Sequence, residues 1–156
     1  MKKRLYIAYG SNMDRRQMEW RCPGARVVAK SWLHDYRLAF QGNPYGAHAN
    51  VIPAKGYDVP VIIWEIDRQH EKALDHYEGV AGGYYTKEML PVEVDGTMQE
   101  ALVYIMGPRY SREIGIPTDS YLGGIAYGYR DFNLDIRILN EAAQEAYASR
   151  QVLIEA

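Results

Sequence analysis

Residues 5–13 read Leu5-Tyr6-Ile7-Ala8-Tyr9-Gly10-Ser11-Asn12-Met13, an apolar run that ends in a cluster of turn-forming residues. Residues 4–9 are rich in β-forming side chains and predict a strand, and a short helix is expected over residues 14–20. Backbone N–H groups around a glycine turn that leads into a helix can converge on a carboxylate or an oxyanion. The loop is therefore a candidate ligand site, although an ordinary turn capped by Ser11 or Asn12 explains the same residues equally well.

The rest of the chain reads as strands followed by helices. Strands are expected over residues 26–33, 36–41, 50–53, 59–66, 84–94 and 98–106, and helices over residues 68–77, 119–130 and 134–150. We expect His34-Asp35 and Lys55-Gly56 to separate neighbouring strands, and Asp95-Gly96-Thr97 to form a hairpin turn. No repeat, low-complexity tract or linker divides residues 1–156, so the sequence predicts a single α+β domain with a mixed, partly closed sheet flanked by helices.

Composition narrows the class of protein. The chain has 156 residues, of which 47% are hydrophobic and 24% charged, as is typical of one globular domain. Its net charge of −2 and its short basic runs, Lys2-Lys3-Arg4 and Arg15-Arg16, argue against nucleic acid as a partner. Cys22 is the single cysteine, which fits a reducing compartment. The apolar run at residues 5–8 is too short for a signal peptide or a membrane span, so we expect a cytoplasmic protein with no membrane partner.

The sequence has no local signature of a metal site or of a covalent nucleophile. Four histidines occur, His34, His48, His70 and His76. None has the spacing of a local zinc motif, although a site assembled from distant parts of the chain stays open. Cys22 lies beside Pro23-Gly24, and a lone cysteine is more often structural than reactive. No nucleophile elbow, Walker loop or dinucleotide-binding fingerprint is present.

One carboxylate stands out. The helix predicted over residues 68–77 has Asp67 placed to cap it and Gly79 placed to end it. Glu78 follows Leu74 by four residues, so both lie on one helix face, and Leu74 is expected to point into the core. Desolvation and the helix dipole would both raise the pKa of Glu78 toward the range that a general acid/base needs. The alternative is a surface glutamate in a fraying last turn.

Together, the two segments resemble the gamma-glutamylcyclotransferase family. Residues 7–13 are similar to the N-terminal substrate loop of that family, and Tyr77-Glu78-Gly79-Val80 is similar to the segment with its catalytic glutamate. Tyr85 and Tyr104 match two pocket tyrosines, and Ser120-Tyr121-Leu122 resembles the opening of the next helix. Residues 34–38 match the early strand pair. The likeness runs from about residue 5 to residue 140 and implies a small mixed, partly closed β-barrel flanked by helices.

The resemblance also implies an activity. The substrate α-amine attacks its own γ-amide carbonyl, which converts a gamma-glutamyl amino acid to 5-oxoproline and a free amino acid. Glu78 would be the general acid/base, with no metal or cofactor. The residues implied to bind the small-molecule gamma-glutamyl substrate are Tyr9, Gly10, Ser11, Asn12, Met13, Tyr85, Tyr104 and Tyr121. Related folds are often dimeric, so a homodimer is compatible, although no residue pattern identifies an interface.

One departure and several alternatives stay open. Members of the family often have a glycine ahead of the tryptophan matched by Trp64, where this chain has Val61-Ile62-Ile63; a larger residue there is expected to reshape the barrel interior or the pocket floor.

A gamma-glutamylamine, such as the ε-amide of lysine, is an alternative substrate. A non-catalytic protein that binds a small acidic metabolite is a further alternative. Glu78 argues against that one, because a carboxylate gains nothing from facing an anionic ligand. Hydrolysis of an ordinary amide is less attractive, because no nucleophile dyad is visible.

Overall fold

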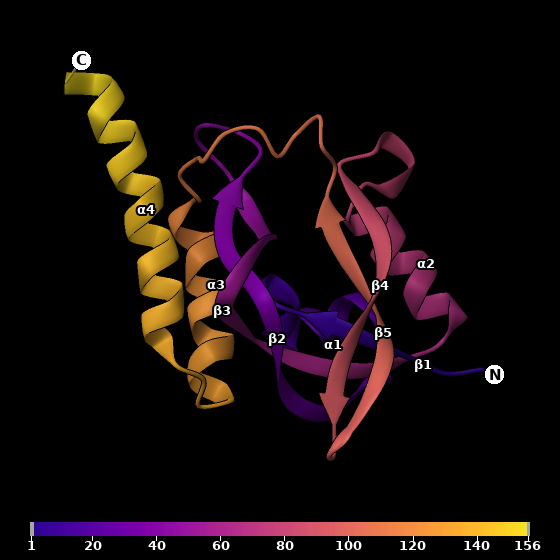
Figure 1. Ribbon diagram of the computed structural model, residues 1–156. Coiled ribbons are helices and arrows are strands. Elements are labelled where there is room, and N and C mark those ends of the chain that lie inside the picture. The colour runs from indigo at the N-terminus through magenta and orange to yellow at the C-terminus, as the bar shows by residue number, and fades with distance from the viewer. Residues whose placement is uncertain (1, 156) are drawn as a thin grey trace.

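A five-stranded mixed sheet forms the centre of the molecule (Figure 1). The computed structural model describes the backbone of residues 2–155 and the side chains of residues 2–150. The strands are β1 (Arg4–Ala8), β2 (Arg26–Gln41), β3 (His48–Ile66), β4 (Tyr85–Val94) and β5 (Thr97–Met106). Their order across the sheet is β2-β3-β1-β5-β4. Strands β1 and β5 run parallel, and every other neighbouring pair is antiparallel.

Strand β1 lies at the middle of the sheet, between β3 and β5. Tyr6 pairs with Trp64 of β3 on one side and with Leu102 of β5 on the other. Ile7 and Ala8 are fully buried. The chain that leaves β1, residues 9–12, therefore begins inside the molecule and not at its rim.

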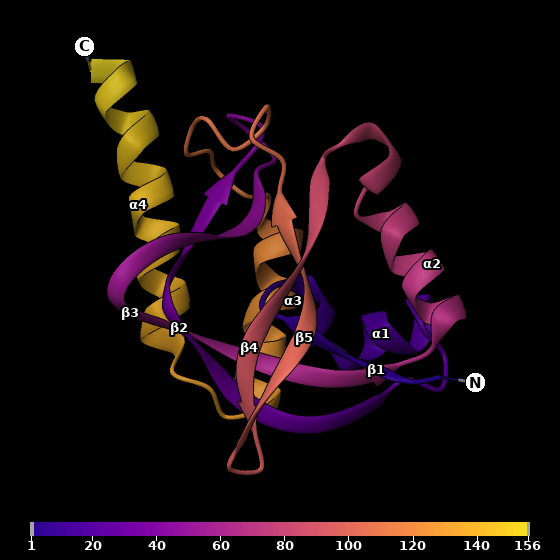
Figure 2. The same ribbon diagram turned by 45° about the vertical axis from the view of Figure 1, so that its right-hand side comes forward.

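Four α-helices surround the sheet. They are α1 (Arg15–Arg21), α2 (Arg68–Tyr77), α3 (Asp119–Asp131) and α4 (Ile136–Glu155), and short 3-10 turns occur at η1 (Ser11–Met13) and η2 (Val80–Gly82). Helix α4 packs against β2 and α3, whereas α2 lies on the opposite side of the molecule (Figures 1 and 2). Within residues 2–155, none of the helices combines the length and apolar character that crossing a lipid bilayer requires.

The predicted boundaries of α2 and of the β4–β5 hairpin are confirmed. The Asp67 side chain accepts a hydrogen bond from the N–H of His70, and the His70 ring accepts one from the N–H of Asp67. This reciprocal pair satisfies two N–H groups that the first turn leaves free. Gly79 ends the helix in the left-handed conformation, with φ of 64°. The hairpin turns on Asp95 and Gly96, both with positive φ, as a two-residue turn requires.

Two long strands replace the four short ones expected between residues 26 and 66. β2 runs through His34-Asp35, where the register slips and Asp35 takes a φ of 65°. β3 runs through Gly56, whose φ is 88° and whose N–H donates to the Asp35 side chain at 3.0 Å. Asp35 and Gly56, which we expected to end strands, therefore form a bulge. The bulge bends β2 and β3 while the two strands stay paired on either side of it.

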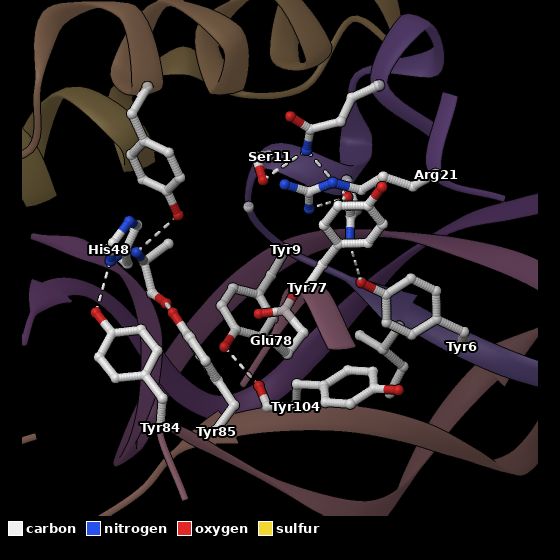
Figure 3. Close-up of a pocket in the computed structure, with 16 residues that line it drawn as sticks. Tyr6, Tyr9, Ser11, Arg21, His48, Tyr77, Glu78, Tyr84, Tyr85 and Tyr104 are labelled. Atoms are coloured by element: carbon white, nitrogen blue, oxygen red, sulfur yellow. Dashed lines mark hydrogen bonds between the residues drawn. The ribbon is translucent and has the colours of Figure 1, made fainter. Parts of the chain in front are cut away.

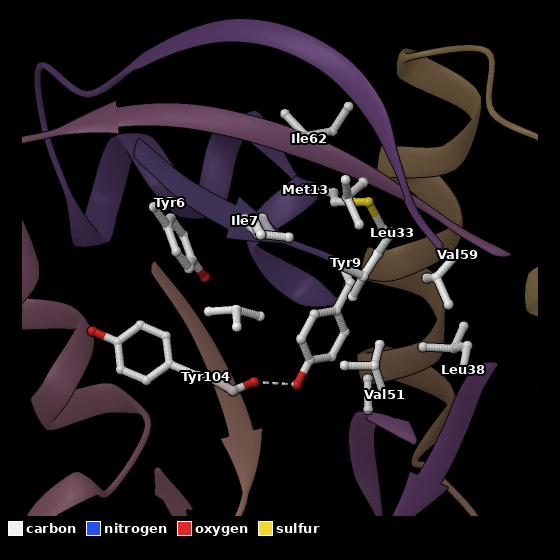
Figure 4. Packing of buried hydrophobic residues seen from close by; sticks show 14 of the residues in the cluster. Tyr6, Ile7, Tyr9, Met13, Leu33, Leu38, Val51, Val59, Ile62 and Tyr104 are labelled. Carbon is white, nitrogen blue, oxygen red and sulfur yellow. Dashed lines mark hydrogen bonds between the residues drawn. The ribbon is translucent and has the colours of Figure 1, made fainter. Parts of the chain in front are cut away.

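That bend brings the two edges of the sheet toward each other. The Ser31 hydroxyl of β2 donates to the Glu93 carbonyl of β4 at 2.6 Å, although no ladder joins the two strands. The expectation of an α+β fold with a partly closed barrel is thus confirmed. Figure 4 shows the hydrophobic side chains that fill the interior, among them Ile7, Leu33 and Ile62.

Candidate active site

A cavity of about 190 Å³ lies where the end of β1 meets the end of α2. It is lined by Tyr6, Ile7, Tyr9, Gly10, Ser11, Asn12, Gln17, Arg21, His48, Ala49, Tyr77, Glu78, Tyr84, Tyr85, Tyr104 and Tyr121. Every predicted site residue except Met13 is in this lining. Figure 3 shows Glu78 near the middle, with Arg21 and Tyr6 to one side and His48 and Tyr84 to the other.

The loop after β1 offers unused hydrogen-bond donors. It turns tightly, because the N–H of Met13 donates to the Gly10 carbonyl at 3.1 Å and that of Asp14 donates to the Ser11 carbonyl at 3.1 Å. In the part of the chain that the structure describes, the N–H groups of Gly10, Ser11 and Asn12 have no acceptor. Neither Ser11 nor Asn12 caps the helix that follows, since Asp14 is the cap of α1. Because these three residues line the cavity, their N–H groups are candidate donors to a ligand.

The Asn12 side chain fixes this loop. Its Nδ2 donates to the Tyr6 hydroxyl at 2.8 Å, and its Oδ1 accepts from Gln17 and from Arg21, each at 3.0 Å. Its backbone carbonyl accepts from the Trp64 indole at 3.1 Å. Because every polar group of the side chain is used, Asn12 holds the loop in one position and is itself only 3% exposed.

Glu78 is the residue that ends α2, and its N–H donates to the Leu74 carbonyl at 2.8 Å. Among the side chains of residues 2–150, none gives its carboxylate a hydrogen bond or an ion pair. Burial raises the pKa of Glu78 to about 7, and the charge of Arg21 opposes that rise. Such a carboxyl can both accept and return a proton near neutral pH.

The hydroxyls of three predicted tyrosines donate hydrogen bonds to other groups of the protein. Tyr9 donates to the Tyr104 carbonyl at 2.6 Å, and Tyr104 in turn donates to Asp75 at 2.7 Å (Figure 4 shows the first of these). Tyr85 donates to the Ala49 carbonyl. These rings form the cavity wall, while their hydroxyls connect separate elements: Tyr104 joins β5 to α2, and Tyr85 joins β4 to β3.

Tyr121 differs, because its hydroxyl serves as an acceptor. The N–H of Ala49 donates to it at 2.9 Å, and burial raises the pKa of the phenol, so it keeps its proton. A methyl group placed on Gly10 would lie 3.7 Å from the Tyr121 oxygen. The phenol therefore lies beside the loop in the cavity lining, and its proton has no acceptor among the residues that the structure describes.

Several lining residues carried no signal in the sequence. Arg21, the last residue of α1, stacks on the Tyr77 ring with 4.5 Å between the guanidinium carbon and the ring centroid. His48 Nδ1 lies 2.6 Å from the Tyr84 hydroxyl, and burial lowers the pKa of the imidazole. Among the side chains of residues 2–150, no group of three or more His, Cys, Asp or Glu is arranged to hold a metal ion.

Two residues singled out from the sequence lie outside the cavity. Met13, expected to bind substrate, is fully buried in the core behind the loop, close to Gly128 of α3 (Figure 4). The 3-10 turn reverses the chain at this point, so the loop faces the cavity while Met13 faces away. Val61 is likewise fully buried in the core and does not form the pocket floor.

Comparisons with known proteins indicate the family and the fold of the chain. Residues 6–123 match the family described as gamma-glutamyl cyclotransferase, AIG2-like. The gamma-glutamylcyclotransferase of Bos taurus is 33% identical over 104 residues, which are 62% of this chain and 53% of that protein. The Homo sapiens protein of the same name is 31% identical over 103 residues, again 62% and 53% of the two chains. The chain thus matches about half the length of these curated relatives. A solved gamma-glutamyl cyclotransferase, at 24% identity, superposes with a TM-score of 0.80 over 90% of this chain and 86% of its own, which supports the fold.

Proposed function

The chain belongs to the gamma-glutamyl cyclotransferase, AIG2-like family, and from that premise we propose that it releases 5-oxoproline from a gamma-glutamyl amino acid. The observation that carries the proposal is the unpaired carboxyl of Glu78, with its pKa raised to about 7, in one cavity with the free amides of the loop at Gly10-Ser11-Asn12.

The reaction needs a base at its first step. The α-amine of the substrate is protonated near neutral pH, and it becomes a nucleophile when Glu78 takes that proton. Because the amine and the γ-carbonyl belong to the same molecule, a folded conformer already brings them together. A cavity of about 190 Å³, smaller than the roughly 300–1,000 Å³ of pockets for drug-sized ligands, favours such a compact conformer.

Attack on the γ-carbonyl carbon forms the ring bond and moves charge to the carbonyl oxygen. The N–H groups of Gly10, Ser11 and Asn12 are the donors we assign to that oxygen, with the Tyr121 hydroxyl beside them. Fixed donors stabilise the developing charge without rearranging, because Asn12 and its partners already hold the loop.

Collapse of this intermediate breaks the bond between the γ-carbon and the leaving nitrogen. The proton that Glu78 received passes to the leaving nitrogen, which departs as an amine and restores the carboxylate. The ring nitrogen still holds one proton too many for an amide, and the restored carboxylate takes this second proton and passes it to the released amine, which leaves as an ammonium group. One carboxyl thus serves as base and then as acid, which is the role that a pKa of about 7 favours.

The test is the release of 5-oxoproline from gamma-glutamyl-alanine and from gamma-glutamyl-ε-lysine, followed by chromatography. We expect the wild type to release 5-oxoproline, with the alanine compound preferred. Preference for the ε-lysine compound would instead favour a gamma-glutamylamine cyclotransferase. Binding of these compounds by folded protein without release would contradict an enzymatic role and favour a metabolite-binding protein.

A further inference from the structure

Resting on the proposed function, we propose that Arg21 binds the α-carboxylate of the gamma-glutamyl group. This carboxylate is present in every gamma-glutamyl substrate and is kept in 5-oxoproline. Arg21 would then hold the α-carboxylate, which the reaction leaves intact, next to Glu78, which transfers the proton.

Arg21 is held in the cavity wall by two contacts. Its Nη1 donates to Asn12 Oδ1 at 3.0 Å, and its guanidinium stacks on the Tyr77 ring at 4.5 Å. It is also the last residue of α1, where the helix dipole favours a positive charge. Both contacts orient the planar group and neither of them neutralises it.

The guanidinium keeps most of its donors free. An arginine has five N–H donors in a planar fork that fits a carboxylate, and Asn12 uses one of them. Arg15 and Arg16, on the same helix, pair with Asp131 at 2.9 Å and Asp14 at 3.0 Å. Within residues 2–150, Arg21 has no such partner. It is thus a cation in the cavity wall that lacks a carboxylate.

The charges around the cavity favour the α-carboxylate as that partner. Among the lining residues, Arg21 is the cation and Glu78 is the carboxyl that exchanges a proton near neutral pH, because burial lowers the pKa of His48. The α-amine that Glu78 must deprotonate and the α-carboxylate are bonded to the same carbon. Since the charge of Arg21 acts on Glu78, a substrate whose amine meets Glu78 carries its carboxylate toward Arg21.

The opposite side of the cavity suits the leaving group. There His48 and Tyr84 pair with each other, and the rings of Tyr84 and Tyr110 lie edge to face with centroids 5.1 Å apart. Burial lowers the pKa of His48 and raises that of Tyr84, so this pair is uncharged near neutral pH and gives a second carboxylate no cation to bind. Arg21 is therefore assigned to the glutamyl group and not to the amino acid that leaves.

Binding of two small molecules tests this assignment without requiring turnover. 5-Oxoproline and 2-pyrrolidinone have the same ring, but the second lacks the carboxylate. By calorimetry, we expect the wild type to bind 5-oxoproline more tightly and Arg21→Met to lose that preference, with 5-oxoproline affinity falling roughly 10- to 100-fold. The matched control is Arg16→Met, on the same helix and stacked on Tyr127 outside the cavity, which should bind as the wild type does.

Two outcomes would overturn the assignment. One is unchanged 5-oxoproline affinity in Arg21→Met; the other is an equal loss in Arg16→Met, which would indicate a general effect on the helix. If Arg21→Met fails to fold by circular dichroism, Arg21→Lys keeps the charge without the fork. That variant should still weaken 5-oxoproline binding, and wild-type affinity in it would again overturn the assignment.

A gamma-glutamyl amino acid has two carboxylates, one on the glutamyl group and one on the leaving amino acid, and kinetics show which of them Arg21 binds. Arg21→Met should raise KM for gamma-glutamyl-alanine and for gamma-glutamyl-methylamide by the same factor, because both have the α-carboxylate. A rise confined to the alanine compound would place the leaving amino acid on Arg21 and contradict the assignment. Absence of 5-oxoproline release by the wild type would instead refute the proposed function, whereas the comparison of 5-oxoproline with 2-pyrrolidinone would still decide the role of Arg21.

Discussion

Glu71 lies in the first turn of helix α2 and Glu78 at its end, and the two carboxyls differ in whether a cation contacts them. Glu71 pairs with Arg4 at 2.8 Å and with Lys87. Partial burial acts to raise its pKa, but the hydrogen bonds from Lys87 and Arg4 outweigh that effect, and the pKa lies below its ordinary value. Glu78 is partly buried and has no such partner within residues 2–150, and desolvation raises its pKa to about 7.

The difference shows how position decides what a carboxyl can do. A carboxylate held by two cations stays ionised and contributes to structure. One that lacks a cation partner and faces a cavity exchanges its proton near neutral pH, as proton transfer requires. We therefore assign Glu71 to the stability of the helix and Glu78 to the chemistry, and the predictions below on these two glutamates test that division.

The largest effect is expected from matched substitutions of the two residues. Glu78→Gln keeps the shape but removes the base, and we expect kcat for 5-oxoproline release to fall on the order of 10²–10⁴-fold. Glu71→Gln should keep kcat within a few-fold of the wild type, because it lies outside the cavity lining. Circular dichroism and 5-oxoproline binding verify that both variants fold. Substantial turnover by Glu78→Gln would remove Glu78 from its role.

The next effect is on the pH dependence of kcat/KM. Glu78 must be ionised to accept the amine proton, so activity should rise with pH up to about 7. Below that midpoint, the rate should fall roughly tenfold per pH unit as the carboxyl becomes protonated. Glu71→Gln should leave this profile in place. A profile that stays flat from pH 5 to 8 would show that the raised pKa does not govern the reaction.

A smaller effect is expected from two tyrosines that hold the same peptide unit. Tyr121 accepts from the Ala49 N–H, and Tyr85 donates to the Ala49 carbonyl. Changing either to Phe leaves a backbone group of Ala49 without its partner and should cost about 1–3 kcal/mol of stability. Only Tyr121→Phe removes a donor that we assign to the reacting oxygen, so it should lower kcat roughly tenfold more than Tyr85→Phe. Equal values of kcat would assign Tyr121 to structure alone.

The smallest effect is on stability, and its sign differs between the two glutamates. The folded pKa of Glu78 exceeds the ordinary 4.5, so its contribution to stability is present below pH 4.5 and is lost as pH rises through about 7. Glu78→Gln should therefore be more stable than the wild type at pH 8, by up to about 3 kcal/mol. Glu71 contributes above its unfolded pKa and loses that contribution in acid, so Glu71→Gln should be less stable at pH 8 by about 1 kcal/mol. Urea denaturation at pH 8 and pH 4 measures both.

The parts of the site that the sequence predicted depend on local signals. Glu78 follows Leu74 by one helical turn, and Gly10-Ser11-Asn12 follows a strand, so each position is set by its own element. The boundaries of α2 were predictable for the same reason, since Asp67 and Gly79 act on adjacent residues.

The parts that were missed depend on contacts between distant elements. Arg21 reaches the cavity because the end of α1 packs near Tyr77, and His48 does so because β3 begins beside Tyr84. Nothing in the spacing of either residue indicates these contacts. The unbroken β2 and β3 were missed because Asp35 and Gly56 are also turn formers, and only their pairing turns the two signals into a bulge.

The most direct test of the division between Glu78 and Glu71 is to titrate both carboxyls in the wild type by ¹³C NMR, with Glu78→Gln and Glu71→Gln used to assign the two resonances. We predict a midpoint of about 7 for Glu78 and one below the ordinary 4.5 for Glu71. A midpoint near 4.5 for Glu78 would contradict the account, because the carboxyl would then be too weak a base for the role we assign to it.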